Sequence, residues 1–209
     1  MPKIICLSDT HNCHDEISVP DGDILIHAGD ATLNGTEIET ENFLAWFSAL
    51  PHKYKIFVAG NHDWLYEKKN RRARLLTAAY KIEYLQDSAI EIDGLKIYGS
   101  PWQPRFYDWA FNLNRGAEIG EKWKLIPPNT DVLITHGPPH GILDETPRGD
   151  LAGCEELIKR VAEIRPRLHV FGHIHQGYGS LEKFGVRFVN ASVCDESYVP
   201  SQKPIIVDL

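Results

Sequence analysis

The 209-residue chain has little of three features that mark specialised classes of protein. It has only four cysteines, none in a C-x-x-C pair, which argues against a disulfide-rich fold and a thiolate metal site. It lacks excess positive charge, because 22 lysines and arginines face 29 acidic residues, and this argues against a dedicated nucleic-acid binder. No apolar run is long enough for a transmembrane helix.

The rest of the composition is typical of a single α/β domain over residues 1–209, since 43% of the residues are hydrophobic and no repeat or linker interrupts the chain. Cys6 and Cys154 lie in apolar stretches, and we interpret them as core thiols of a reducing compartment. The residues before the first strand do not form the apolar region of a signal peptide. We therefore expect a cytoplasmic protein that makes no stable nucleic-acid or membrane complex, with its oligomeric state left open.

Five apolar, strand-like runs each end in side chains that suit a metal ion. The residues that follow these runs are, in chain order, Asp9 and His11, Asp30, Asn61 and His62, His136, and His173 and His175. Functional sites of α/β sheets form just beyond the carboxyl ends of strands, so we expect these side chains to converge. Each one alone is better explained as a strand-end cap or a buried, hydrogen-bonded histidine. Five coincidences at the same kind of position favour a shared site.

The candidate ligands offer oxygen and imidazole nitrogen rather than thiolate sulfur. Such donors suit Mn²⁺, Fe or Zn²⁺ and disfavour an iron–sulfur cluster. They are too many for one tetrahedral ion, but they suit two ions that share a bridging carboxylate. Two-metal sites of this kind act on phosphate esters.

The order of the expected elements indicates two packed β-sheets with helices outside them. Early β-α-β order, with a helix over about 36–50, gives way to a hairpin-rich middle and end. Asp93-Gly94 is a strong hairpin signal. We expect further helices in the basic stretch 68–74 and from about 151 to 164, and a long ordered loop at 100–114.

Taken together, these blocks resemble the ordered motif set of the calcineurin-like metallophosphoesterases. The motifs are Asp9-x-His11, Gly29-Asp30, Gly60-Asn61-His62-Asp63, His136 and Gly172-His173-x-His175. They extend over about residues 4–175, and the sequence flanking them is similar to the metallophosphoesterase-domain-containing subgroup. That subgroup is associated with phosphodiester and cyclic-nucleotide hydrolysis. The resemblance implies a four-layer α/β/β/α sandwich.

The resemblance also implies a ligand set for two divalent metal ions. One ion would be held by Asp9, His11 and His175, the other by Asn61, His136 and His173, with Asp30 bridging the two. Mn²⁺ is the first expectation for the metal, with Fe, Zn²⁺, Co²⁺ and Ni²⁺ as alternatives. A hydroxide between the ions would attack phosphorus in line. His62 would assist the leaving group, and Asp63 is a candidate to orient its imidazole.

The same centre predicts a small anionic substrate, either a phosphodiester or a nucleotide. Two divalent ions bring four positive charges, and two aspartates contribute two negative charges. The centre would therefore carry about +2 despite the acidic surface. Four residues in nearby loops are candidate substrate contacts: His14, Trp102, Arg105 and His140. The alternative for each of them is loop packing.

Three other functions compete with that of a phosphodiesterase. A phosphomonoesterase is the main alternative, although the protein phosphatases of this family carry an arginine just after Gly-Asp, and Gly29-Asp30 is followed by Ala31. A catalytically weak metal-binding scaffold should have degraded ligand positions, and this sequence keeps them all. A repair nuclease is disfavoured by the net charge of −7.

Overall fold

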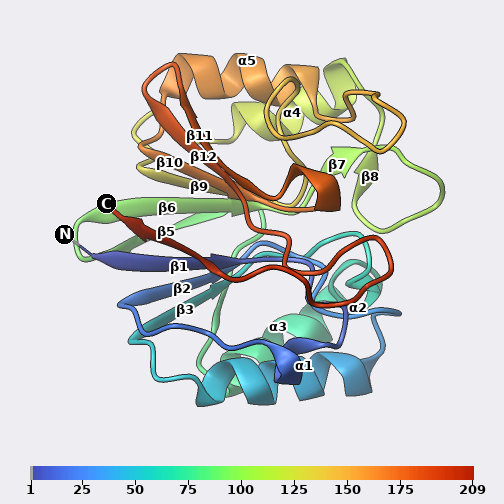
Figure 1. Cartoon of the computed structure of the whole chain (residues 1–209), viewed down its shortest axis with the longest axis vertical. Coiled ribbons are helices and arrows are strands. Elements are labelled where there is room, and N and C mark those ends of the chain that lie inside the picture. The colour runs from blue at the N-terminus through green and yellow to red at the C-terminus, as the bar shows by residue number, and fades with distance from the viewer. Residues whose placement is uncertain (1) are drawn as a thin grey trace.

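Two twisted β-sheets lie face to face, and helices cover the outer side of each sheet (Figure 1). The computed structural model describes residues 2–209. Helices α1 (Glu37–Ala49) and α3 (Asn70–Ala79) cover one sheet, and helices α4 (Ala117–Lys124) and α5 (Glu155–Ile164) cover the other (Figure 1). The predicted four-layer α/β/β/α arrangement is thereby confirmed.

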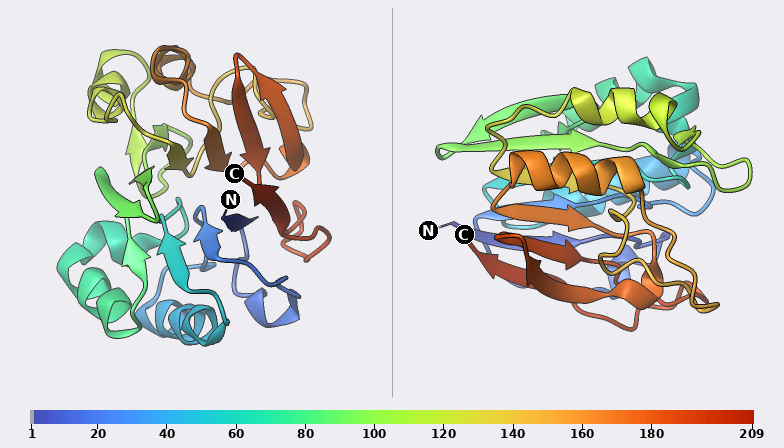
Figure 2. Two further views of the ribbon diagram at one scale, coloured as in Figure 1. Left: turned by 90° about the vertical axis from the view of Figure 1, so that its left-hand side faces the viewer. Right: turned by 90° about the horizontal axis from the view of Figure 1, so that it is seen from above.

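The first sheet has the strand order β13-β1-β2-β3-β4. Its strands are β1 (Lys3–Leu7), β2 (Ile24–His27), β3 (Tyr54–Phe57), β4 (Glu83–Tyr84) and β13 (Ile205–Asp208). Strands β1 to β4 run parallel, whereas β13 runs antiparallel to β1. Lys3 pairs with Asp208, so the two ends of the chain lie side by side (Figure 2).

The second sheet has the order β11-β12-β10-β9-β6-β5. Its strands are β5 (Ser88–Ile92), β6 (Leu95–Ser100), β9 (Val132–Thr135), β10 (Leu168–Phe171), β11 (Gly179–Lys183) and β12 (Val186–Asn190). The four central strands run parallel and the two edge strands are antiparallel to them. Asp93 and Gly94 join β5 to β6 with φ values of 48° and 82°, the left-handed pair that a two-residue hairpin turn requires.

The continuous apolar runs of the parallel strands are explained by burial on both faces. In β1, Ile4 and Cys6 point between the two sheets, whereas Ile5 and Leu7 point toward the helices. Strand β2 alternates in the same way. Buried polar side chains inside these strands need a partner, as His169 of β10 has in Thr135, whose Oγ1 lies 2.9 Å from its Nε2.

The first expected helix is confirmed, whereas the next two differ from the sequence expectation in where they begin. Helix α1 (Glu37–Ala49) starts with the capping box of Thr36 and Glu39. The expected basic helix is two helices, α2 (Trp64–Lys68) and α3 (Asn70–Ala79). Helix α5 (Glu155–Ile164) begins later than residue 151, because Cys154 is held in extended pairing with Pro139.

Some regular structure had no sequence expectation. Helix α4 (Ala117–Lys124) and the short 3-10 turns η1 (His14–Glu16) and η2 (His175–Gly177) belong to this group. The expected loop at 100–114 contains two short paired strands, β7 (Gln103–Pro104) and β8 (Asn112–Leu113). Within residues 2–209, no helix is both long and apolar enough to cross a bilayer.

Candidate metal centre

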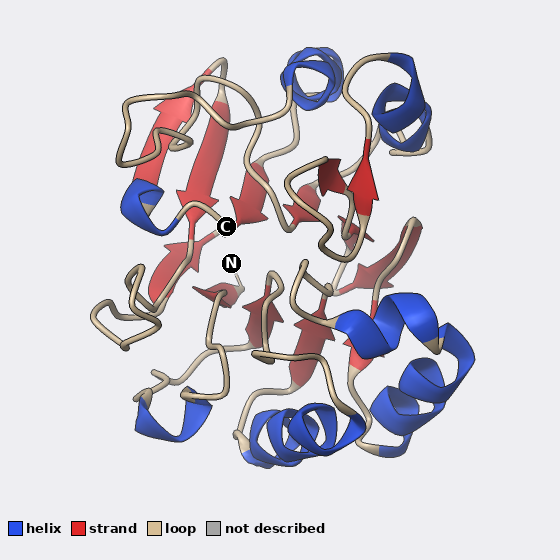
Figure 3. Cartoon of the chain, turned by 90° about the vertical axis from the view of Figure 1, so that its right-hand side faces the viewer, coloured by secondary structure: helices blue, strands red, loops and turns tan. Residues whose placement is uncertain are grey.

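The candidate ligands follow the carboxyl ends of β1, β2, β3, β9 and β10, which meet at one edge of the two sheets. Figure 3 looks onto this edge, where the connecting loops gather. Backbone hydrogen bonds tie the loops together, from Asp9 N to Gly29 O at 2.8 Å and from Gly172 N to His136 O at 2.9 Å. The first bond joins the loops that follow β1 and β2, and the second joins the loops that follow β9 and β10.

The side chains form two groups that could each hold a metal ion. The first group is Asp9, His11 and His175, and the second is Asp30, His136 and His173; within each group the ligand atoms lie within 4.8 Å of one another. A third set with the same spacing, His11, Asp30 and His62, takes one member from each of these groups and adds His62. Asp30 Oδ2 lies 3.3 Å from His136 Nε2 and 3.9 Å from His11 Nε2. Asp30 therefore faces both groups, which is the position that a bridging carboxylate needs.

Asn61 completes the second group. Its Oδ1 lies 2.9 Å from His136 Nε2, so the amide oxygen points to the same place as the imidazole. All seven residues expected to bind metal are thus brought together, although they come from positions as far apart as 9 and 175.

Hydrogen bonds select which imidazole nitrogen faces the centre. His136 Nδ1 donates to Ala28 O at 3.0 Å, and His175 Nδ1 donates to Asp195 O at 2.8 Å. Nε2 of each ring therefore faces the centre, beside Asp30 for His136 and beside Asp9 for His175. The buried ring of His11 has no hydrogen-bond partner on either nitrogen within residues 2–209. A buried unpaired nitrogen is costly, and a cation beside His11 Nε2 would satisfy it. The donor set therefore fits two divalent ions.

The charges of the site suit a cation. Burial alone would raise the pKa of Asp30, but His136 beside it holds that pKa well below its usual value. Burial lowers the pKa of His11 to about 4 and that of His173 to about 3, so both rings are neutral. Burial also disfavours a proton on His136, yet Asp30 raises the pKa of His136 to about 9. A divalent cation bound here would replace that proton.

The loops that carry the ligands are strained. Asp9, His11, Asp30 and His173 have φ values of 56°, 40°, 54° and 69°, in the left-handed region that non-glycine residues rarely adopt. Each such residue costs on the order of 1–3 kcal/mol, and strain of this kind concentrates at functional sites. A Cβ added to Gly172 would overlap Asp9 Oδ2, which explains glycine at that position.

His62 lies beside the candidate ligands, and its ring is held by the backbone carbonyl of Leu33 rather than by Asp63. Its backbone N–H donates to Asp30 Oδ1 at 2.7 Å, and its ring Nδ1 lies 2.7 Å from Leu33 O. The ring stacks on Trp109 with 4.2 Å between centroids and meets His11 edge-on at 4.7 Å.

The expectation that Asp63 orients this imidazole is corrected by these contacts. The Asp63 carboxylate accepts hydrogen bonds from Gly60 N at 2.7 Å and from Thr32 N and Oγ1 at 3.1 and 2.8 Å. Asp63 therefore fixes the two loops that carry Asp30 and His62, while Leu33 O orients the ring. Burial and the nearby Asp30 raise the pKa of Asp63 to about 6.

Three residues near the centre were missed by the sequence analysis. Ser192 Oγ donates to Asp9 Oδ2 at 2.8 Å, and the Tyr198 ring lies 4.4 Å from that of His11. Trp109 is the third, through its contact with His62. Ser192 and Tyr198 reach the site because Val193 N donates to Ser8 O, which brings the segment after β12 alongside β1. No local pattern in the sequence signals this pairing.

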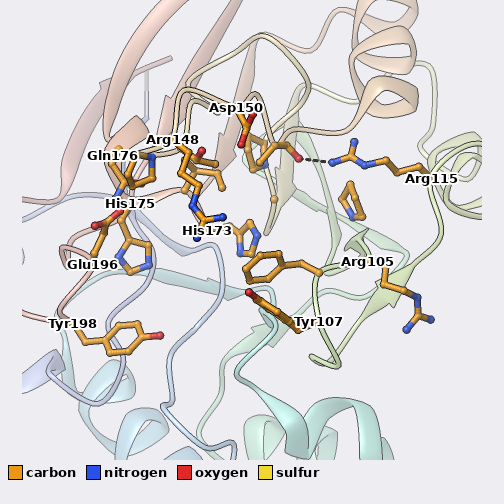
Figure 4. Close-up of a pocket in the computed structure, with 18 residues that line it drawn as sticks. Arg105, Tyr107, Arg115, Arg148, Asp150, His173, His175, Gln176, Glu196 and Tyr198 are labelled. Carbon is orange, nitrogen blue, oxygen red and sulfur yellow. Dashed lines mark hydrogen bonds between the residues drawn. The ribbon is translucent and has the colours of Figure 1, made fainter.

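A cavity of about 520 Å³ opens beside the ligands (Figure 4). His173 and His175 form part of its wall, together with Tyr107, Arg148 and Tyr198. The side chains of Tyr107 and Tyr198 project into it from opposite sides in Figure 4. The candidate metal centre is therefore open to a small molecule.

The four candidate substrate contacts have different positions relative to this cavity. Arg105 lines it, but Arg105 Nε donates to Asn114 Oδ1 at 3.2 Å and its guanidinium points away from the centre of the cavity (Figure 4). Trp102 is held by Asp87, whose Oδ2 accepts from the indole Nε1 at 2.9 Å, and by Lys122, whose Nζ lies 4.3 Å from its ring. These contacts favour loop packing over substrate contact for Trp102.

His14 and His140 do not line the cavity either. His14 is buried at η1 with its ring 5.2 Å from Trp46 and 6.0 Å from Phe43. His140 Nδ1 lies 3.8 Å from the carboxylate of Asp144. For both histidines the contacts favour a role in packing.

The chain is similar to known proteins over almost its whole length. The family model of the calcineurin-like phosphoesterases matches residues 2–177. The human metallophosphoesterase domain-containing protein 1 is 44% identical over 230 residues, which cover 99% of this chain and 71% of that protein.

Two solved structures share the fold at low sequence identity. The phosphopantetheinyl hydrolase of Mycobacterium tuberculosis aligns with a TM-score of 0.62 and 15% identity, over 91% of this chain and 89% of that one. The protein TT1561 of Thermus thermophilus aligns with a TM-score of 0.61 and 13% identity, over 90% of this chain and 88% of that one. At such identities the likeness concerns the fold alone.

Proposed function

The chain belongs to the calcineurin-like phosphoesterase family, and from that premise we propose that it is a phosphodiesterase that works with two divalent metal ions. The observation that carries this proposal is the position of Asp30 between two ligand groups. A single-ion site would have no use for a carboxylate oxygen directed at both groups. Two-metal centres are suited to displacement at phosphorus.

In this proposal the ligands divide as the family pattern implies. Asp9, His11 and His175 would hold one ion, Asn61, His136 and His173 would hold the other, and Asp30 would serve both. Mn²⁺ is the first choice for these oxygen and nitrogen donors, with Fe, Zn²⁺, Co²⁺ or Ni²⁺ as alternatives. When bound, such ions supply positive charge to the phosphate and lower the pKa of water to about 7 in favourable cases.

His62 has the position of an acid for the leaving group. Leu33 O accepts a hydrogen bond from Nδ1, so Nε2 is the nitrogen that can donate to the leaving oxygen, which it does when the ring is the doubly protonated imidazolium. Stacking on Trp109 restricts rotation of the ring, which keeps that nitrogen in one place. General acid catalysis of this kind contributes roughly 10²–10⁴-fold.

A diester is favoured over a monoester by the loop after Asp30. Ala31, Thr32 and Leu33 follow Asp30, and none of them carries a positive charge for the second charge of a monoester. The aromatic side chains of Phe106 and Tyr107 at the cavity favour an organic substituent on the phosphate, and a cyclic nucleotide is one candidate. A phosphomonoesterase is the second candidate function, and a metal-binding scaffold the third.

A comparison of two model substrates tests the proposal. Protein of measured metal content is assayed with a bis-aryl and a mono-aryl phosphate, with and without Mn²⁺. We expect Mn²⁺-dependent hydrolysis of the diester at a higher kcat/KM than that of the monoester. Faster hydrolysis of the monoester would favour the phosphatase alternative, and no turnover of either ester by metal-replete protein would favour a scaffold.

We also propose that the protein works in a reducing compartment such as the cytoplasm. All four cysteines are free thiols, and Cys6, Cys154 and Cys194 are buried. Free buried thiols are typical of such compartments. Subcellular fractionation would test this, and recovery of the protein outside the cell would contradict it.

A further inference from the structure

A short hairpin between β9 and α5 reaches over the cavity beside the candidate metal centre. Its tip is closed by two backbone hydrogen bonds, from Gly149 N to Thr146 O and from Thr146 N to Asp150 O, both 2.9 Å long. Gly149 has a φ of 81° and ends the turn. Arg148 precedes it at the tip, so its side chain projects from the hairpin.

The base of this hairpin is fixed to the rest of the protein. The buried carboxylate of Asp144 accepts hydrogen bonds from Gly141 N at 3.0 Å and Gly153 N at 2.9 Å. Arg115 donates to Gly153 O at 2.7 Å and to Ala152 O at 2.8 Å. The position of the tip is therefore set by bonds at both strands of the base.

Arg148 differs from the other two arginines of the cavity in having no partner. The guanidinium of Arg115 is bound at the hairpin base, and that of Arg105 is bound to Asn114. Within residues 2–209, no acceptor lies at hydrogen-bonding distance from the Arg148 guanidinium. Figure 4 shows Arg148 directed into the cavity, toward His173. An unpaired guanidinium beside a centre built for phosphate is suited to bind an anion.

We propose that Arg148 binds a non-bridging oxygen of the phosphate at the centre and thereby sets the activity on monoesters relative to diesters. This inference rests on the proposed function. A monoester carries up to two negative charges and three non-bridging oxygens, whereas a diester carries one charge and two such oxygens. A guanidinium can pair with two oxygens of either ester, but the additional negative charge of the monoester strengthens the attraction, so Arg148 stabilises the monoester more. The lower monoester activity that we expect beside the preferred diester activity would then depend on Arg148.

The test compares Arg148→Ala and Arg148→Lys with the wild type, each loaded with Mn²⁺ and checked for metal content. We expect Arg148→Ala to lower kcat/KM for a mono-aryl phosphate about 10- to 100-fold, the size of a lost charged hydrogen bond. The loss for a bis-aryl phosphate should be clearly smaller. Arg148→Lys should recover part of the monoester activity, because it keeps the charge and loses the paired geometry. Arg71→Ala, at an exposed arginine of α3, is the matched control.

A binding measurement separates this inference from the proposed function. Inorganic phosphate is titrated into each metal-loaded protein by calorimetry, and Arg148→Ala should raise its Kd about 10-fold or more, while Arg71→Ala leaves it unchanged. Equal losses on both esters, or an unchanged Kd for phosphate, would overturn the role of Arg148. Wild-type protein that hydrolyses neither ester would refute the proposed function, while the phosphate titration would still decide whether Arg148 binds the anion.

Discussion

Replacement of Asp30 by asparagine should weaken both metal sites at once. Asp30 Oδ1 accepts the backbone N–H of His62 at 2.7 Å, and Oδ2 faces His136 and His11. An asparagine has one acceptor oxygen, and the N–H of His62 keeps it at the Oδ1 position. The amide NH₂ then takes the place of Oδ2. It directs N–H groups, which cannot ligate a metal ion, toward both metal positions.

The size of the effect follows from the loss of a direct anionic ligand. Loss of a group that only supports a metal ligand already costs about 10- to 100-fold in metal affinity, so Asp30→Asn should weaken each site by at least that factor. Mn²⁺ titrations of the wild type and the variant measure this. Asp15→Asn, at an exposed position with the same change in charge, is the control. Loss of only one ion, or unchanged affinity for both, would refute the bridging role.

The metal-free proteins provide a second readout. Burial opposes a charge on His136, but Asp30 raises the pKa of His136 to about 9, above the unfolded value near 6.5. This pair therefore stabilises the metal-free fold below pH 6.5, and the contribution is lost as the pH rises to about 9. The loss is on the order of 3 kcal/mol. Urea unfolding should show this decline in the wild type, and Asp30→Asn should lack it.

Two further predictions concern histidines with different roles. His62→Ala should keep the metal content of the wild type and lower kcat for the diester by roughly 10²–10⁴-fold; unchanged turnover in metal-replete protein would remove His62 from the mechanism. Burial lowers the pKa of His169 to about 3, so the unfolded chain gains a proton there below about pH 6.5 that the folded chain does not. In the wild type, the free energy of unfolding should fall by about 1.4 kcal/mol per pH unit between about pH 6 and 4 because of His169, and His169→Leu should remove this part of the decline. Urea unfolding of both proteins over this pH range measures it. The same pH dependence in both would contradict the prediction.

The convergence of the candidate ligands could be predicted from the sequence because they follow buried parallel strands. The ends of such strands meet at a common edge, so Asp9, Asp30 and His136 could be grouped without knowledge of side-chain geometry. The role of Asp63 could not be predicted. Its carboxylate bonds to Thr32, which is 31 residues away, and that contact depends on how two loops pack.

Other features depended on pairing between distant segments. Ser192 and Tyr198 reach the centre only because the segment after β12 runs beside β1, and nothing near them in the sequence signals this. Trp102 suggested a substrate contact, but Asp87 and Lys122 bind its indole. Helix α4 was missed although Ile119 and Trp123 are buried on one face of it, because Gly120 between them lowers helix propensity.

The number of metal ions bound per chain, measured together with activity, tests the central claim most directly. Metal-free protein is titrated with Mn²⁺ while bound metal and hydrolysis of a bis-aryl phosphate are followed in the same samples. We expect saturation at two ions per chain, with hydrolysis that appears as the second ion binds. Saturation at one ion, or full occupancy by two ions without hydrolysis, would contradict a two-metal phosphodiesterase.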